Sequence, residues 1–150
     1  MRAALDTNVL AYAEGVNGAR MKNAALRLLG ELPPEALVVP VQALSELFHV
    51  LTRKAGRKPA EARAAVLSWH NAFRVAEISS AVLLAAADLA VAHRLGIWDA
   101  VIICAAAEAG CQLLLSEDMQ DGFIWKGVTL ANPFARPRHP LLAAMTGSSA

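Results

Sequence analysis

The chain has 150 residues, a formal net charge of +1, and hydrophobic side chains at 56% of its positions. This length suits one domain of ordinary size, which needs no disulfide to be stable. The longest apolar stretches, 81–87 and 100–107, are shorter than the roughly 20 residues that cross a bilayer. Asp6 interrupts the N-terminus before a signal peptide can form. We therefore expect a cytoplasmic protein that acts at no membrane and is not a general polyanion binder.

The first half of the chain alternates short apolar runs with segments of helical periodicity. Pro33 closes one of these helical segments and Pro59 opens another. Strands are expected around Leu5 and over 36–39, and helices over 7–14, 19–32, 41–55 and 59–73.

The second half continues the alternation. Strands are expected over 74–78, 112–115 and 128–130, and helices over 80–95 and 100–109. Ser79 or Ser80 is the expected N-cap of the first helix. Its predicted buried face consists of Leu84, Ala87, Val91 and Leu95. The second helix is apolar nearly all round, which is typical of a helix buried on several sides.

This order of elements predicts an α/β fold. Strands that alternate with helices favour a three-layer α/β/α sandwich around a central, mostly parallel sheet. In such sheets ligands bind beyond the carboxyl ends of the strands. The cysteines, Cys104 and Cys111, are seven residues apart, a spacing of neither a redox pair nor a zinc site, and we expect buried free thiols.

Four carboxylates occupy similar places in this scheme: Asp6, Glu46, Asp99 and Asp118. Two follow predicted strands, one begins a helix, and Glu46 lies in the helix after a third strand. Because the carboxyl ends of parallel strands share one edge of a sheet, these acids are expected to converge. Converging carboxylates raise one another's pKa unless a cation holds them. Magnesium prefers oxygen ligands and supports phosphodiester cleavage, so metal-dependent chemistry is the first hypothesis.

Each acid also has a structural explanation. Asp6 and Asp99 suit a helix N-cap or first turn, and Asp121 belongs to an Asp-Gly turn. Glu46 shares a polar helix face with Gln42, which fits a solvated face and the wall of a cleft equally well. Other chemistries have little support, since the four histidines share no metal-ligand spacing and no GxSxG or phosphate-binding glycine loop occurs.

Three blocks of the sequence resemble the PIN-domain family, and within it the VapC-type toxins of bacterial toxin–antitoxin pairs. They are LDTNVLAYA at 5–13, VQALSELFHVL at 41–51 and WDAVIICAAAEAGCQLLLSEDMQDG at 98–122. The resemblance extends from Met1 to about Pro133. It implies a PIN-like α/β/α sandwich and endonucleolytic cleavage of RNA that depends on Mg²⁺ or Mn²⁺.

The resemblance also implies roles for individual residues. The catalytic, metal-binding acids would be Asp6, Glu46, Asp99 and Asp118. Asn8 would orient water or a ligand, and Ser116 would support the acidic turn. Asp121 matches an acid that only some members of the family have, which leaves its role open.

The implied partners are an RNA substrate, a second copy of the chain in a homodimer, and a cognate antitoxin. Such an antitoxin typically inserts a peptide, often with an arginine, into the acidic pocket, where it supplies positive charge. Arg53, Lys54, Arg57 and Lys58 are candidates for RNA phosphates, although basic residues also suit a solvated helix end. We expect a nuclease domain over 1–135 and a tail over 136–150 that is disordered or docks on a partner through Leu141 and Leu142.

Two other functions remain open from the sequence. One is a phosphotransfer or phosphatase domain with Asp6 as nucleophile, although no second aspartate completes a DxD pair. The other is a non-catalytic module that binds RNA or a protein partner. The sequence leaves open the RNA target, the antitoxin, the choice between Mg²⁺ and Mn²⁺, and the number of metal ions.

Overall fold

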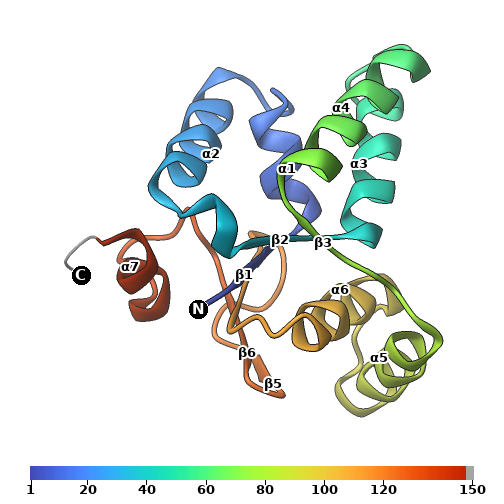
Figure 1. The fold of residues 1–150 in the computed structure, drawn as a ribbon, viewed down its shortest axis with the longest axis vertical. Helices are drawn as coiled ribbons and strands as arrows, with labels where there is room; N and C mark the ends of the chain where they lie inside the picture. The colour runs from blue at the N-terminus through green and yellow to red at the C-terminus, as the bar shows by residue number, and fades with distance from the viewer. Residues whose placement is uncertain (148–150) are drawn as a thin grey trace.

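A six-stranded sheet forms the centre of the protein in a computed structural model that describes residues 1–147 (Figure 1). The strands are β1 (Ala3–Leu5), β2 (Leu37–Pro40), β3 (Arg74–Ala76), β4 (Leu113–Leu115), β5 (Ile124–Trp125) and β6 (Val128–Ala131). Their order is β3-β2-β1-β4-β6-β5, and every pair is parallel except β5–β6. The predicted mostly parallel α/β sheet is confirmed.

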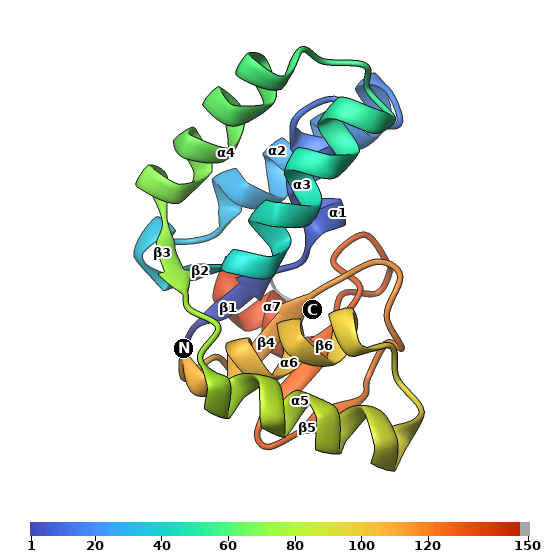
Figure 2. The ribbon, with the colours of Figure 1, turned by 90° about the vertical axis from the view of Figure 1, so that its right-hand side faces the viewer.

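Helices cover both faces of this sheet. They are α1 (Thr7–Ala13), α2 (Ala19–Glu31), α3 (Val41–Arg53), α4 (Pro59–Ala72), α5 (Ser80–His93), α6 (Ile97–Glu108) and α7 (Pro140–Thr146), with a 3-10 turn at Pro34–Ala36. Helices α1 to α4 lie on one side of the sheet, and α5 and α6 lie on the other (Figures 1 and 2). The three-layer sandwich is therefore confirmed.

The central strand β1 fixes where a site can form. It lies between β2 and β4, so the chain builds the sheet outward to β3 and then returns to the other side of β1. Such a reversal of strand order leaves a crevice at the carboxyl ends of the two neighbouring strands. Leu5 of β1 pairs with Leu115 of β4. Asp6 directly follows β1 and Ser116 directly follows β4, so both residues lie at the crevice.

Helix α6 is the buried helix that its composition predicts. Every residue from Ala100 to Ala106 is buried, and the helix contacts α5 and four strands of the sheet. Its alanines let it lie close to these neighbours, and this packing fixes Asp99 in the first turn of the helix. The thiols of Cys104 and Cys111 are buried and free, as expected.

Helix α5 differs from its predicted orientation. The expected N-cap is confirmed, because the Ser79 hydroxyl accepts a hydrogen bond from the backbone N–H of Val82 at 3.2 Å. However, Leu84 and Val91 of the predicted buried face are 67% and 83% exposed. The buried residues are Val82, Ala86 and Leu89. The helix itself has apolar residues on several of its sides, so helical periodicity alone does not determine which side faces the sheet.

Strand β5 was absent from the predicted elements. It has two residues and pairs with β6 through a turn at Lys126 and Gly127, whose φ angles of 45° and 82° are typical of a tight hairpin. Two residues are too few to show alternation, and the sequence therefore gives no signal for this strand.

The C-terminal segment also differs from expectation. Residues 140–146 form α7, and Leu142 is fully buried in the core of its own chain. Arg138 forms an ion pair with Glu31 at the end of α2 at 2.5 Å. The expectation of a disordered tail is therefore wrong for this helix, and Leu142 is not available for docking on a partner. The remainder of the expected tail, 148–150, lies outside the described residues.

Within residues 1–147, no helix is both long and apolar enough to span a membrane.

Candidate active site

Asp6 is held at the carboxyl end of β1 by two hydrogen bonds. It is the N-cap of α1, and its Oδ1 accepts from the backbone N–H of Thr7 at 2.7 Å. Its Oδ2 accepts from the Ser116 hydroxyl at 2.6 Å. Only 4% of the residue is exposed. Asp6 is thus a helix N-cap, as the sequence allowed. This capping bond also holds the carboxylate beneath the crevice, so capping and a catalytic role are compatible.

Ser116 links Asp6 to Asp118. Its hydroxyl also lies 3.0 Å from Asp118 Oδ1, and it donates its one proton to either carboxylate. The side-chain amide of Asn8 donates to the same Asp118 oxygen at 3.0 Å. The backbone N–H of Glu117 donates to Asn8 Oδ1 at 3.4 Å. These bonds position the acidic turn after β4 against the first turn of α1.

Glu46 points from α3 toward the same crevice. Thr7 donates its hydroxyl proton to Glu46 Oε2 at 2.6 Å, and Gln42 donates from one turn earlier at 3.5 Å. Of the two interpretations that the sequence left open for this polar face, the structure supports the wall of a cleft. Thr7 thus connects the first turn of α1 to Glu46.

Electrostatic interactions connect these acids to Asp99. Burial raises the pKa of Asp99, and the charges of Asp118 and Glu46 raise it further. The four acids that the sequence singled out, from four separate segments of the chain, therefore interact electrostatically, although only Glu46 and Asp118 line the cavity described below.

Asp6 carries the largest perturbation. Its pKa is raised to about 7: burial makes the largest contribution, the hydrogen bonds from Ser116 and Thr7 lower the pKa, and the charges of Asp118 and Glu46 raise it. A carboxyl group in this state favours a nearby cation, because positive charge stabilises its ionised form.

A cavity of about 780 Å³ opens above these acids. Thr7, Asn8, Glu46 and Asp118 line it on one side, and Trp98 is exposed at its edge. Its size suits a nucleotide-sized ligand rather than a single ion. The other lining residues are Ala11, Tyr12, Val16, Asn17, Gln42, Ser45, His49, Val50 and Lys54.

The oxygen ligands present suit a hard divalent cation. Among residues 1–147, no three His, Cys, Asp or Glu side chains already stand as a ligand set for one ion. Magnesium, however, is commonly bound by one or two carboxylates together with waters and substrate phosphates. The donors therefore fit Mg²⁺ or Mn²⁺, and the assignment of all four acids as metal ligands stays a prediction.

Tyr12 also belongs to this site and is not among the residues that the sequence singles out. The Tyr12 hydroxyl donates a hydrogen bond to Glu117, and burial together with that carboxylate raises the pKa of Tyr12 to about 12. Tyr12 is the chain's one tyrosine and lies one helical turn after Asn8. That spacing was the signal that could have placed it on the same face.

Asp121 is exposed and makes a structural contact. Its Oδ1 accepts a hydrogen bond from the backbone N–H of Asn132 at 2.9 Å, and Asn132 Oδ1 accepts from the backbone N–H of Phe134 at 3.0 Å. These bonds connect the Asp-Gly turn to the segment that follows β6. These contacts agree with the structural role in an Asp-Gly turn that the sequence allows for Asp121.

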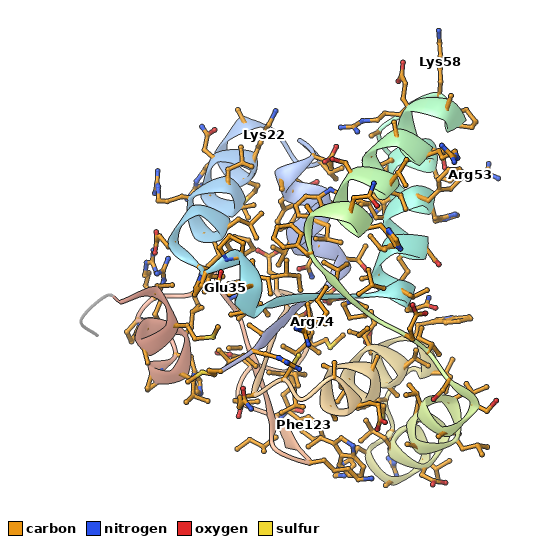
Figure 3. All side chains as sticks on the ribbon, viewed as in Figure 1. Lys22, Glu35, Arg53, Lys58, Arg74 and Phe123 are labelled. Atoms are coloured by element: carbon orange, nitrogen blue, oxygen red, sulfur yellow. The ribbon has the colours of Figure 1, made fainter. Side chains whose placement is uncertain are left out.

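The candidate RNA-binding residues separate into two groups. Arg57 donates to Glu14 Oε1 at 2.8 Å and to the Glu14 carbonyl oxygen at 2.6 Å. It is therefore engaged within the fold, where it ties the α3–α4 loop to α1. Lys54 lines the cavity, whereas Arg53 and Lys58 point outward at the far end of α3 and the start of α4 (Figure 3). We keep these three lysine and arginine residues as candidates.

Comparison with solved structures gives several similar folds. The toxin VapC20 of Mycobacterium tuberculosis, described as cleaving the sarcin-ricin loop, is 24% identical, with a TM-score of 0.64 over 75% of this chain and 86% of that one. A toxin–antitoxin complex from Klebsiella pneumoniae is 22% identical, with a TM-score of 0.66 over 88% and 98%. FitAcB from Neisseria gonorrhoeae is 16% identical, with a TM-score of 0.64 over 88% and 98%.

No curated protein sequence matches the chain. The family model described as the PIN domain matches residues 3–120, which include every strand through β4 and all four acids of the site. The chain therefore belongs to the PIN-domain family.

Proposed function

We propose that this protein is a metal-dependent endoribonuclease and the toxin of a toxin–antitoxin pair. The observation that carries the proposal is the Ser116 hydroxyl, which lies within hydrogen-bonding distance of both Asp6 and Asp118 in a PIN-domain chain. It joins two acids from opposite ends of the sequence at one edge of the sheet. The charge of Glu46 acts on both Asp6 and Asp99.

In this proposal the four acids would hold Mg²⁺ or Mn²⁺. The ion would supply positive charge for the phosphodiester and for the water that attacks it. Ser116 and Asn8 keep the carboxylate of Asp118 turned toward the crevice, and Thr7 does the same for Glu46. Because these bonds exist in the folded protein, the oxygen ligands need little reorganisation before cleavage.

The cavity is suited to a nucleic acid strand. Lys54 gives it a positive charge at the α3 side, with Arg53 close by in sequence. The exposed indole of Trp98 at its edge offers a surface for base stacking. Unpaired bases can stack on such a ring, so we propose a single-stranded or looped RNA segment as substrate.

An antitoxin is the proposed protein partner. The similar structure from Klebsiella pneumoniae is a toxin–antitoxin complex. An arginine from such a partner would find a carboxylate-lined cavity, where it could bind in place of a cation. A homodimer remains a prediction from the family resemblance.

The alternative phosphotransfer function is disfavoured by one observation. Asp6 is buried and both of its carboxylate oxygens accept hydrogen bonds, which hinders its approach to a phosphorus atom. The non-catalytic alternative would keep RNA binding but would show no turnover.

The test compares Asp99→Asn with Asp88→Asn. Both side chains are exposed and both substitutions remove one negative charge, but Asp99 lies close enough to Asp118 and Glu46 for their charges to raise its pKa, whereas Asp88 lies on α5. Cleavage of total cellular RNA by the parent in Mg²⁺ should stop in EDTA. We expect Asp99→Asn to lower the rate by about 100-fold or more and Asp88→Asn to leave it unchanged. Equal cleavage by Asp99→Asn and the parent would contradict the site.

A further inference from the structure

Four arginines surround a small cavity of about 160 Å³ between α2 and the segment 133–138. This arginine cluster consists of Arg20, Arg27, Arg136 and Arg138. Its tail members lie beyond residue 120, where the match to the PIN-domain model ends. Arg20 and Arg27 lie within the matched region, so the complete cluster depends on residues outside it.

Most of the positive charge in the cluster is uncompensated. Arg138 is the least exposed member, with 11% of its side chain exposed, and it pairs with Glu31. The other three are exposed and form no ion pair with any residue in the described part of the chain. The hydrogen bond from Arg138, and then the charges of Arg138, Arg136 and Arg27, hold the pKa of Glu31 below its usual value. Thus one carboxylate faces several guanidinium groups.

The arginine cluster adjoins the acidic cavity. Phe134 lines the arginine-lined cavity, and Tyr12 lines the acidic one. Their rings are in contact, with centroids 5.7 Å apart and an interplanar angle of 56°. The two cavities are therefore neighbours, with one pair of aromatic rings between them.

We infer that the arginine cluster binds backbone phosphates of the same RNA strand whose bond is cut in the acidic cavity. This inference rests on the proposed function. Guanidinium groups match phosphate oxygens in pairs, and single-stranded RNA presents one phosphate per nucleotide.

The charge distribution favours a phosphate chain over a folded protein surface. The whole chain has a net charge of only +1, so this concentration of cations is local. Four of the nine residues that line the cavity are arginines, whereas the cores of protein interfaces are depleted of charged residues. An acidic segment of a protein partner is the competing occupant, and the experiment separates the two.

The test variant carries Arg27→Gln and Arg136→Gln, which leaves the Arg138–Glu31 pair intact. The matched control carries Arg63→Gln and Arg74→Gln, exposed residues on α4 and at the amino end of β3. Binding of a labelled, mixed-sequence single-stranded RNA is measured by fluorescence anisotropy in EDTA over a range of salt. We expect the test variant to bind about 10-fold more weakly at low salt, with a salt slope less steep by about 1.4. The control should keep the parent values.

Separate outcomes distinguish the inference from the proposed function. If the parent cleaves RNA with Mg²⁺ but the test variant keeps the parent's Kd and salt slope, the inference is overturned and the proposed function stands. A parent that cleaves no RNA would overturn the proposed function. An oligoglutamate peptide is the second probe, and loss of peptide binding with unchanged RNA binding would instead assign the cluster to a protein partner. If the double variant has a lower Tm, Arg136→Gln alone should change the slope by about 0.7.

Discussion

Ser116 and Asp6 lie 110 residues apart in sequence and share a buried hydrogen bond of 2.6 Å. The bond exists because β1 and β4 are neighbours in register, which places the residue after each strand side by side. It both stabilises an ionised carboxylate in a buried place and lowers the pKa of Asp6.

Ser116→Ala should weaken both folding and cleavage. The substitution leaves Asp6 Oδ2 without its hydrogen-bond donor, which costs about 1–3 kcal/mol of folding free energy for a buried polar group. It also removes one of the two donors near Asp118 Oδ1, so we expect cleavage to fall by about 10-fold. Urea unfolding and RNA cleavage measure the two effects. The control is Ser68→Ala, exposed on α4, and equal effects of the two variants would contradict this role.

Asp6 should make the metal-free protein less stable as pH rises. Its folded pKa of about 7 lies above the ordinary value of 3.8, so between these values the folded state retains a proton that the unfolded chain has lost. Stability contributed by this protonation is therefore present at low pH and disappears as pH rises through about 7, by up to a few kcal/mol at ~1.4 kcal/mol per pKa unit.

The Asp6→Asn variant isolates this effect, because asparagine can still cap α1. In EDTA, we expect its Tm to exceed that of the parent at about pH 8 and to approach it at about pH 5, where Asp6 is protonated. Cleavage should be lost. The control Asp88→Asn should follow the parent at every pH, and a parent–Asp6→Asn difference that does not change with pH would contradict the argument.

Asp121 should affect stability rather than chemistry. Asp121→Ala removes the acceptor for the Asn132 N–H, and we expect a loss of about 0.5–1.5 kcal/mol with kcat close to that of the parent. Thermal unfolding and cleavage kinetics in Mg²⁺ test this. A loss of about 100-fold in kcat without a change in Tm would instead make Asp121 a member of the catalytic set.

Two leucines of α5 provide a matched test of the orientation of this helix. Leu89 is fully buried, whereas Leu84 is 67% exposed on the same helix. Leu89→Ala should lower the free energy of unfolding by about 2–5 kcal/mol, and Leu84→Ala should change it by about 0.5 kcal/mol or less. Chemical denaturation measures both. The reverse order would restore the face that helical periodicity predicted.

The sequence by itself determined the alternation of strands and helices and the positions of the acids. Those features depend on local pattern: an apolar run, a proline or glycine boundary, and an aspartate directly after a strand. Asp6 and Asp118 could be placed at one edge because parallel strands end at the same edge. The resemblance to the PIN-domain family added Glu46, for which spacing alone allowed two interpretations.

Only the tertiary structure decided the remaining questions, because they depend on contacts between distant segments. The Thr7 hydroxyl holds Glu46 toward the cleft through a hydrogen bond. Arg57 pairs with Glu14 within the fold and is therefore not available to bind RNA. The buried face of α5 depends on the surface of α6, since the helix is apolar on several sides. Leu142 is likewise buried by its own chain, a contact that no local pattern records.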